Sequence, residues 1–213
     1  MPGYCLDEKK EEKNSPGASC RAFWKKLYWI RTLSGKGEDR DVALLKPDLV
    51  VGRLADLDIG FWYEKGIRAV LIDLDNTISP WRENRITKDA RDFFARAGTN
   101  GIRVLLFTNA SGSRARKAAQ CAGLEAVFQA KKPFPAGYKR VLKKLGLEPS
   151  QVMTIGDQIF TDTLGGNLAG CTTVLIPPLE DHEYGGTKVL RFMERLIGVK
   201  QIFRRPVGGP DED

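Results

Sequence analysis

Five short apolar runs, each joined to the next by a segment with helical character, constrain the fold of this chain more than any other feature. The runs are AVLIDL (69–74), VLLFTN (104–109), AVFQA (126–130), VMTIGD (152–157) and TTVLIP (172–177). Continuous aliphatic runs of this length are typical of strands buried on both faces. Strands that alternate with helices favour right-handed crossovers, so we expect an α/β, three-layer fold with a parallel sheet.

The segments between these runs carry helix start and stop signals. We expect four helices, over residues 87–98, 113–123, 135–146 and 161–170. The first begins at Thr87 or Asp89, and Ser111 or Ser113 caps the second. The third begins with proline and ends with glycine, which is typical of helices. The fourth is weakened by Gly165 and Gly166.

Polar side chains follow four of the expected strands at the point where each strand ends. Because the carboxyl ends of parallel strands meet at one edge of a sheet, we expect these side chains to lie together. They are Asp73 and Asp75 after the first strand, Thr108 and Asn109 after the second, Lys131 and Lys132 after the third, and Asp157, with Asp162 beyond it, after the fourth.

This combination of side chains suits phosphoryl transfer. Carboxylates that crowd one edge repel one another unless a cation lies among them, and oxygen ligands of this kind favour Mg²⁺. A lysine and a threonine can hold the oxygens of a phosphoryl group. One carboxylate can then act as the nucleophile, and a second can protonate the leaving oxygen and later activate water.

Four motifs in this order resemble those of the haloacid-dehalogenase (HAD) superfamily of aspartate-nucleophile phosphatases. They are DLDNT (73–77), FTN (107–109), KKP (131–133) and GDQIFTD (156–162). The run from residue 47 to residue 81 is also similar to the front of subfamily IIIA, which includes the YqeG family and the mitochondrial phosphatidylglycerophosphate phosphatases.

The resemblance implies a role for each matching residue. Asp73 would be the nucleophile and an Mg²⁺ ligand, and Asp75 the general acid/base that also offers its backbone carbonyl to the metal. Thr108 would bind the transferring phosphoryl group, with Asn109 nearby. Lys132, or else Lys131, would neutralise phosphate and nucleophile. Asp157 would ligate Mg²⁺, and Asp162 would support it directly or through water.

The short intervals between the motifs predict a capless, open site. Residues 78–106 and 110–130 leave room for a helix and little else, where many relatives for small metabolites carry a cap domain. An open site suits a bulky substrate, such as a lipid head group, a protein or a nucleic-acid end, whose own body helps to exclude water.

Composition excludes several other classes of protein. No run approaches the roughly 20 apolar residues of a membrane-spanning helix. The polar N-terminus does not resemble a secretory signal, and four scattered cysteines suggest a reducing cytoplasm. With a single histidine, His182, a Ser-His-Asp or multi-histidine metal mechanism is not expected.

The formal net charge of +7 is concentrated near the two ends of the chain. Residues 21–31 carry +4 and residues 188–205 carry +5, and both segments read as basic amphipathic helices. Basic faces with aromatic residues suit an anionic membrane surface, or equally simple packing on the domain. We therefore divide the chain into a mobile tail and basic helix (1–40), a phosphatase domain (41–187) and a basic helix with a C-terminal tail (188–213).

These features give one leading hypothesis and several alternatives. The leading one is a peripheral, Mg²⁺-dependent phosphomonoesterase that acts on an anionic phospholipid, phosphatidylglycerophosphate, at the inner face of a membrane. The same chemistry on a soluble phosphate, a phosphoprotein or a nucleic-acid end is a second reading. A third is a non-catalytic RNA- or ribosome-binding module that uses the basic termini on a phosphate backbone.

Overall fold

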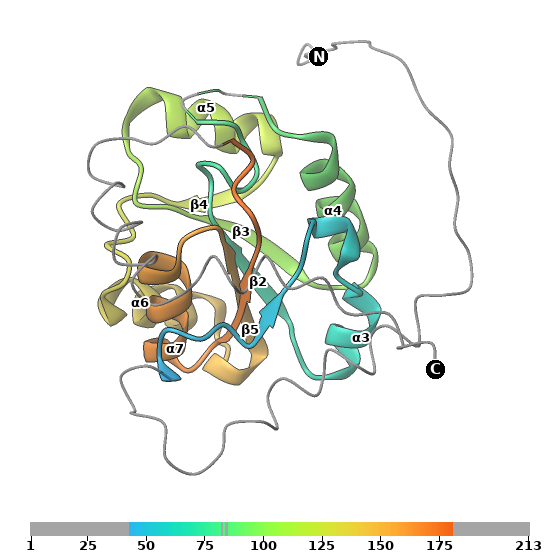
Figure 1. The fold of residues 1–213 in the computed structure, drawn as a ribbon, viewed down its shortest axis with the longest axis vertical. Helices are drawn as coiled ribbons and strands as arrows, with labels where there is room; N and C mark the ends of the chain where they lie inside the picture. The colour runs from blue at the N-terminus through green and yellow to red at the C-terminus, as the bar shows by residue number, and fades with distance from the viewer. Residues whose placement is uncertain (1–42, 82, 84, 181–213) are drawn as a thin grey trace, which may run out of the picture. The chain divides into compact units, whose positions relative to one another are not determined.

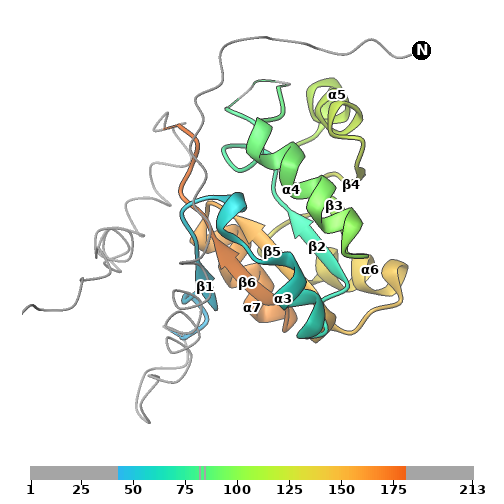
Figure 2. The same ribbon diagram turned by 90° about the vertical axis from the view of Figure 1, so that its right-hand side faces the viewer.

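The computed structural model describes residues 43–81, 83 and 85–180, and it confirms the α/β fold with a parallel sheet. Six strands pair in the order β1-β6-β5-β2-β3-β4, and every neighbouring pair is parallel. Figure 1 shows the fold, and Figure 2 labels all six strands. The strands are β1 (Leu49–Val50), β2 (Ala69–Ile72), β3 (Arg103–Phe107), β4 (Glu125–Val127), β5 (Val152–Gly156) and β6 (Thr172–Leu175).

Helices cover both faces of this sheet, as expected. They are α3 (Ile59–Glu64), α4 (Lys88–Thr99), α5 (Gly112–Ala122), α6 (Pro135–Leu145) and α7 (Leu164–Ala169), with 3-10 turns at Leu54–Asp56 and Pro149–Gln151. Helices α3 and α4 lie on one side of the sheet, and α6 and α7 lie on the other (Figures 1 and 2). Tyr138, Val141 and Leu142 of α6 pack on strand residues such as Leu71 and Phe107 in a buried cluster.

The boundaries of the first three predicted helices hold to within about two residues. Thr87 caps α4, and its hydroxyl accepts a hydrogen bond from the Ala90 N–H at 3.3 Å. Gly123 and Gly146 end α5 and α6 in the left-handed conformation, which glycine adopts without strain. Ser111 occupies the cap position of α5 but its side chain makes no capping hydrogen bond.

The expected helix over residues 161–170 has a different form. A π-helical turn (Ile159–Thr163) comes first, and α7 follows it directly. Gly165 and Gly166, which we read as weakening this helix, instead allow close packing. A Cβ on Gly165 would lie 2.7 Å from the Tyr138 hydroxyl, and one on Gly166 would lie 2.5 Å from Thr154 Oγ1. The two glycines therefore let α7 lie directly against α6 and β5.

Two elements lie before the first strand that the sequence predicted. Strand β1 extends the sheet beyond β6, with Leu49 opposite Val174, and α3 follows it. The edge is fixed by Asp48, whose carboxylate accepts a hydrogen bond from the Thr173 N–H at 3.0 Å. The sheet therefore begins well before the first motif, DLDNT (73–77).

The intervals between the motifs are filled as the capless fold requires. In the part of the chain that the structure describes, residues 78–106 form α4 and β3, and residues 110–130 form α5 and β4, with no inserted domain. The helices of this same part are all too short or too polar to cross a bilayer. The predicted basic helices over 21–31 and 188–205, and the ends of the predicted domains, lie outside the described residues.

Candidate active site

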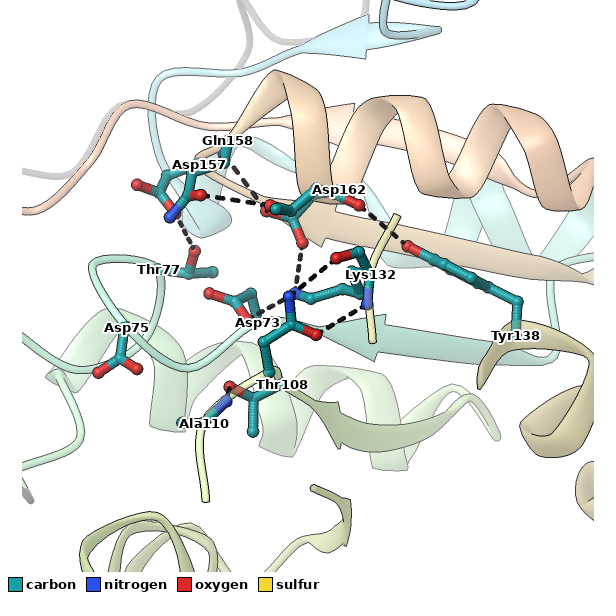
Figure 3. A network of polar contacts seen from close by, with 12 residues as sticks. Asp73, Asp75, Thr77, Thr108, Ala110, Lys132, Tyr138, Asp157, Gln158 and Asp162 are labelled. Carbon is teal, nitrogen blue, oxygen red and sulfur yellow. Dashed lines mark hydrogen bonds and ion pairs between the residues drawn. The ribbon is translucent and has the colours of Figure 1, made fainter. Parts of the chain in front are cut away.

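Three carboxylates from separate parts of the chain meet at the carboxyl edge of the sheet. Asp73 directly follows β2, Asp157 directly follows β5, and Asp162 lies in the π-helical turn. Each offers an oxygen, and these oxygens all lie within 4.8 Å of one another (Figure 3). The structure thus brings together the three side chains that the strand-end pattern placed at one edge.

Lys132 lies between two of these carboxylates. Its Nζ donates to Asp73 Oδ1 at 2.6 Å and to Asp162 Oδ1 at 2.5 Å, and its side chain is only 3% exposed. Burial alone would lower the pKa of Lys132, but Asp162 and Asp73 outweigh that effect and raise it above its ordinary value. Lys131 is exposed, so of the two candidate lysines it is Lys132 that reaches the carboxylates.

Asn109, which we expect near the transferring phosphoryl group, bonds the backbone of Lys132 through its side-chain amide. Its Oδ1 accepts a hydrogen bond from the Lys132 N–H at 2.7 Å, and its Nδ2 donates to the Lys132 carbonyl at 3.0 Å. Both ends of the amide are therefore engaged by the backbone of the lysine. In this arrangement Asn109 positions Lys132.

Thr108 is buried at the end of β3, beside these groups. Its hydroxyl oxygen accepts a hydrogen bond from the Ala110 N–H at 3.0 Å, which fixes the turn that leads into α5. In that bond the hydroxyl oxygen is the acceptor, so the hydroxyl O–H can still donate a hydrogen bond to another group. The Ala130 N–H donates to the Thr108 carbonyl, so this turn is also tied to the segment that carries Lys132.

Asp75 lies apart from the carboxylate cluster (Figure 3). Arg114, from the first turn of α5, holds it: Nη2 donates to Asp75 Oδ1 at 2.6 Å and to Oδ2 at 2.9 Å. Burial raises the pKa of Asp75, Arg114 lowers it and the Asp73 charge raises it, and the balance lies above the ordinary value. The sequence analysis assigned no role to Arg114. Its one signal in the sequence is its place as a basic residue in the first turn of α5, the helix that follows the FTN motif (107–109).

Thr77 is a second residue that the sequence reading left without a role. Its hydroxyl donates to Asp157 Oδ1 at 3.2 Å (Figure 3). Burial, followed by the charges of Asp73 and Asp162, raises the pKa of Asp157 well above its ordinary value. Burial also raises the pKa of Asp162 to about 6, although Lys132 opposes this shift. A bound cation stabilises the ionised form of crowded, buried acids such as these.

Comparison with known proteins identifies the family. The family model described as a haloacid dehalogenase-like hydrolase matches residues 18–170. The chain belongs to this family. The hydrolase is also 29% identical over 134 residues to the probable phosphatase YqeG of Bacillus subtilis, covering 63% of this chain and 78% of that protein.

Two further relatives of the hydrolase are named for a lipid substrate. One is the mitochondrial phosphatidylglycerophosphatase GEP4 of Saccharomyces cerevisiae, 30% identical over 147 residues that cover 63% of this chain and 78% of that protein. The other is the chloroplastic/mitochondrial phosphatidylglycerophosphate phosphatase 1 of Arabidopsis thaliana, 29% identical over 164 residues. That match covers 72% of this chain and 46% of the plant protein. Family and relatives confirm the prediction of a HAD-type phosphatase.

The donor set of this hydrolase fits a magnesium ion. Asp73, Asp157 and Asp162 offer only oxygen ligands, and their atoms are close enough to share one ion. Burial, followed by the charges of Asp73 and Asp162, raises the pKa of Asp157, as is typical of acids crowded together without a cation. The carboxylate of Asp75 is not part of this group. The resemblance implies a metal contact for the backbone carbonyl of Asp75, and that contact stays a prediction.

Proposed function

We propose that the chain is a Mg²⁺-dependent phosphomonoesterase that forms a phosphorylated Asp73 and converts phosphatidylglycerophosphate to phosphatidylglycerol. The observation that carries the chemistry is the contact of Lys132 with Asp73 inside the carboxylate cluster. A buried ammonium at this point neutralises the nucleophile and an approaching phosphate together. The names of two relatives support the choice of substrate.

The first half of the reaction transfers the phosphoryl group to the protein. The Asp73 oxygen that Lys132 does not contact attacks phosphorus, and the bond from phosphorus to the ester oxygen breaks. Asp75 in its protonated form gives its proton to that oxygen, so the leaving group departs as an alcohol. The raised pKa of Asp75 favours the protonated form that this step requires.

The second half returns the protein to its starting state. Asp75, now ionised, takes a proton from a water molecule as the water oxygen attacks phosphorus. The bond from phosphorus to the Asp73 oxygen breaks, which releases inorganic phosphate and restores the free carboxylate. The same acid thus serves both half-reactions, and its proton balance closes over one turnover.

The remaining groups stabilise charge on the phosphoryl oxygens. The Thr108 hydroxyl donates a hydrogen bond to one of these oxygens, and the Lys132 ammonium stabilises their negative charge. Asp73, Asp157, Asp162 and the backbone carbonyl of Asp75 are the groups that would hold Mg²⁺, which when bound supplies positive charge for the phosphoryl oxygens. Asn109 keeps the lysine in place through the backbone of Lys132.

The substrate and the location are proposed on broader grounds. The formal charge of +7 favours an anionic partner, and the absence of an inserted domain in the described intervals suits a bulky one. We propose a cytoplasmic protein that contacts the inner face of an anionic membrane peripherally. Comparison of sedimentation with anionic and with neutral vesicles tests this point, and equal binding to both would contradict it.

Measurement of phosphate release tests the activity. Wild type and Asp73→Asn are assayed with Mg²⁺ and with EDTA on phosphatidylglycerophosphate in mixed micelles, on an aryl phosphate and on a 3′-phosphorylated oligonucleotide. Mg²⁺-dependent release from the lipid that disappears in Asp73→Asn supports the proposal. Release from the oligonucleotide alone would point to nucleic-acid ends, and salt-sensitive RNA binding without any release would point to a binding module.

A further inference from the structure

Arg114 bonds both the proposed acid/base, Asp75, and the backbone of the loop that follows it. Its Nη2 contacts both oxygens of Asp75, and its Nη1 donates to the Glu83 carbonyl at 3.2 Å. The same carbonyl accepts a hydrogen bond from the Ser79 hydroxyl at 3.0 Å. The guanidinium therefore connects α5 to the loop that runs from Asp75 to Glu83.

This pairing competes with the chemistry of Asp75 during a turnover. An acid/base must bring one oxygen to the ester oxygen of the substrate, but Arg114 lies within hydrogen-bond distance of both carboxylate oxygens. Protonation of one Asp75 oxygen, which the proposed acid step requires, removes negative charge and weakens the bond from Arg114 to the carboxyl group. A guanidinium whose bond to a carboxylate weakens in a partly buried site is stabilised by a second anion, because an unpaired charge there is costly.

The position of Arg114 indicates which part of the substrate supplies that anion. Asp75 contacts the leaving-group oxygen in the proposed reaction, so its partner Arg114 lies on the leaving-group side. The Arg114 side chain is 27% exposed, whereas that of Lys132 is 3% exposed and is held by two carboxylates. Arg114 can therefore turn toward a ligand while Lys132 remains with Asp73.

We propose that Arg114 determines specificity by binding a second anionic group within the leaving group of the phosphomonoester. The inference rests on the proposed function and names the substrate class for it: monoesters whose leaving alcohol carries a phosphodiester or a similar anion. The planar guanidinium suits such an anion because it offers two parallel N–H donors. Phosphatidylglycerophosphate belongs to this class, and so does a soluble molecule with the same head group.

The test compares two water-soluble substrates that differ in the charge of the leaving group. Dihexanoyl phosphatidylglycerophosphate has an anionic leaving group, and glycerol 3-phosphate has a neutral one. We expect Arg114→Met to lower kcat/KM for the first about 10- to 100-fold more than for the second. Arg114→Lys should recover part of this difference. Arg116→Met, an exposed position two residues along α5, is the matched control and should change neither value.

A binding measurement keeps the inference testable if Arg114→Met is inactive. In the Asp73→Asn background, calorimetry gives the affinity for dihexanoyl phosphatidylglycerol, the product that retains the phosphodiester. A loss of about 10-fold with Arg114→Met supports the inference. Equal losses on both substrates together with unchanged product affinity would overturn it and leave Arg114 as a positioning residue for Asp75. Wild type that is inactive on both substrates would overturn the proposed function as well.

Discussion

The side-chain amide of Asn109 pairs with both backbone polar groups of Lys132, at 2.7 Å to the N–H and 3.0 Å to the carbonyl. These two bonds connect the end of β3 to the segment after β4. The segment also contains Lys131, whose backbone φ is 57°. Residues other than glycine, asparagine and aspartate rarely adopt this conformation. The amide therefore supports the backbone next to a residue in a rarely adopted conformation.

Asn109→Ala should lower both stability and turnover. Loss of two hydrogen bonds to partly buried backbone groups should cost about 1–3 kcal/mol in urea unfolding, and kcat should fall at least tenfold because Lys132 loosens. Asn100→Ala is the control, since Asn100 Nδ2 donates to the Arg96 carbonyl at the end of α4. A variant at position 109 with full kcat would show that the amide is structural alone.

Lys132→Met should destabilise the fold as well as abolish phosphate release. It leaves Asp73 and Asp162 buried without their partner, which should cost about 3–5 kcal/mol in urea unfolding. The double variant Lys132→Met with Asp162→Asn should recover part of the stability and none of the activity. Lys131→Met serves as the control at an exposed neighbour. Equal stability of Lys132→Met and wild type would contradict the interpretation.

Asp157→Asn should have opposite effects on stability with and without Mg²⁺. Burial and the charges of Asp73 and Asp162 raise the pKa of Asp157, so its ionised form disfavours the fold at neutral pH. In EDTA the variant should be more stable than wild type by on the order of 1 kcal/mol. Added Mg²⁺ should raise the melting temperature of wild type and not of the variant. Equal Mg²⁺ shifts would exclude Asp157 as a ligand.

The buried thiol of Cys171 predicts an alkaline loss of stability. Burial raises the pKa of Cys171 to about 12, against roughly 8.5 for an unfolded chain. Below pH 8 both states hold the proton and the contribution is complete. From about pH 9 upward only the unfolded chain releases it, so the free energy of unfolding should fall by up to about 1.4 kcal/mol per pH unit.

Urea unfolding of wild type and Cys171→Ala between pH 8 and pH 10 measures this effect. The variant should show a shallower decline over that range. Cys121→Ala, which removes an exposed thiol from α5, controls for the loss of a cysteine. Identical pH slopes in Cys171→Ala and wild type would contradict the prediction.

The central strands could be predicted from sequence because strands buried on both faces consist mainly of aliphatic residues. β2 is buried at every position, and the run that encodes it is aliphatic throughout. β1 has only Leu49 and Val50, which is too short to show any period, and it exists because the β6 edge and Asp48 hold it. Such an element follows from tertiary contacts that local pattern does not contain.

The candidate site divides in the same way. Asp73, Asp157 and Lys132 could be placed because each follows a strand, and the topology brings strand ends together. Arg114 could not, because its contact with Asp75 depends on how α5 is oriented over the loop after β2. The same holds for Asn109, whose type suits either a ligand or a backbone, and only the geometry of Lys132 decides between them.

Gly165 and Gly166 carry no chemistry, yet the position of an acid depends on them. The π-helical turn that holds Asp162 runs without a break into α7, and α7 sits where it does because hydrogen atoms, and not methyl groups, face Tyr138 and Thr154. Alanine at either position would push the helix outward and pull the carboxylate away from its ammonium partner. Substitutions at these two glycines should accordingly be tolerated as poorly as substitutions at the acidic residues of the site.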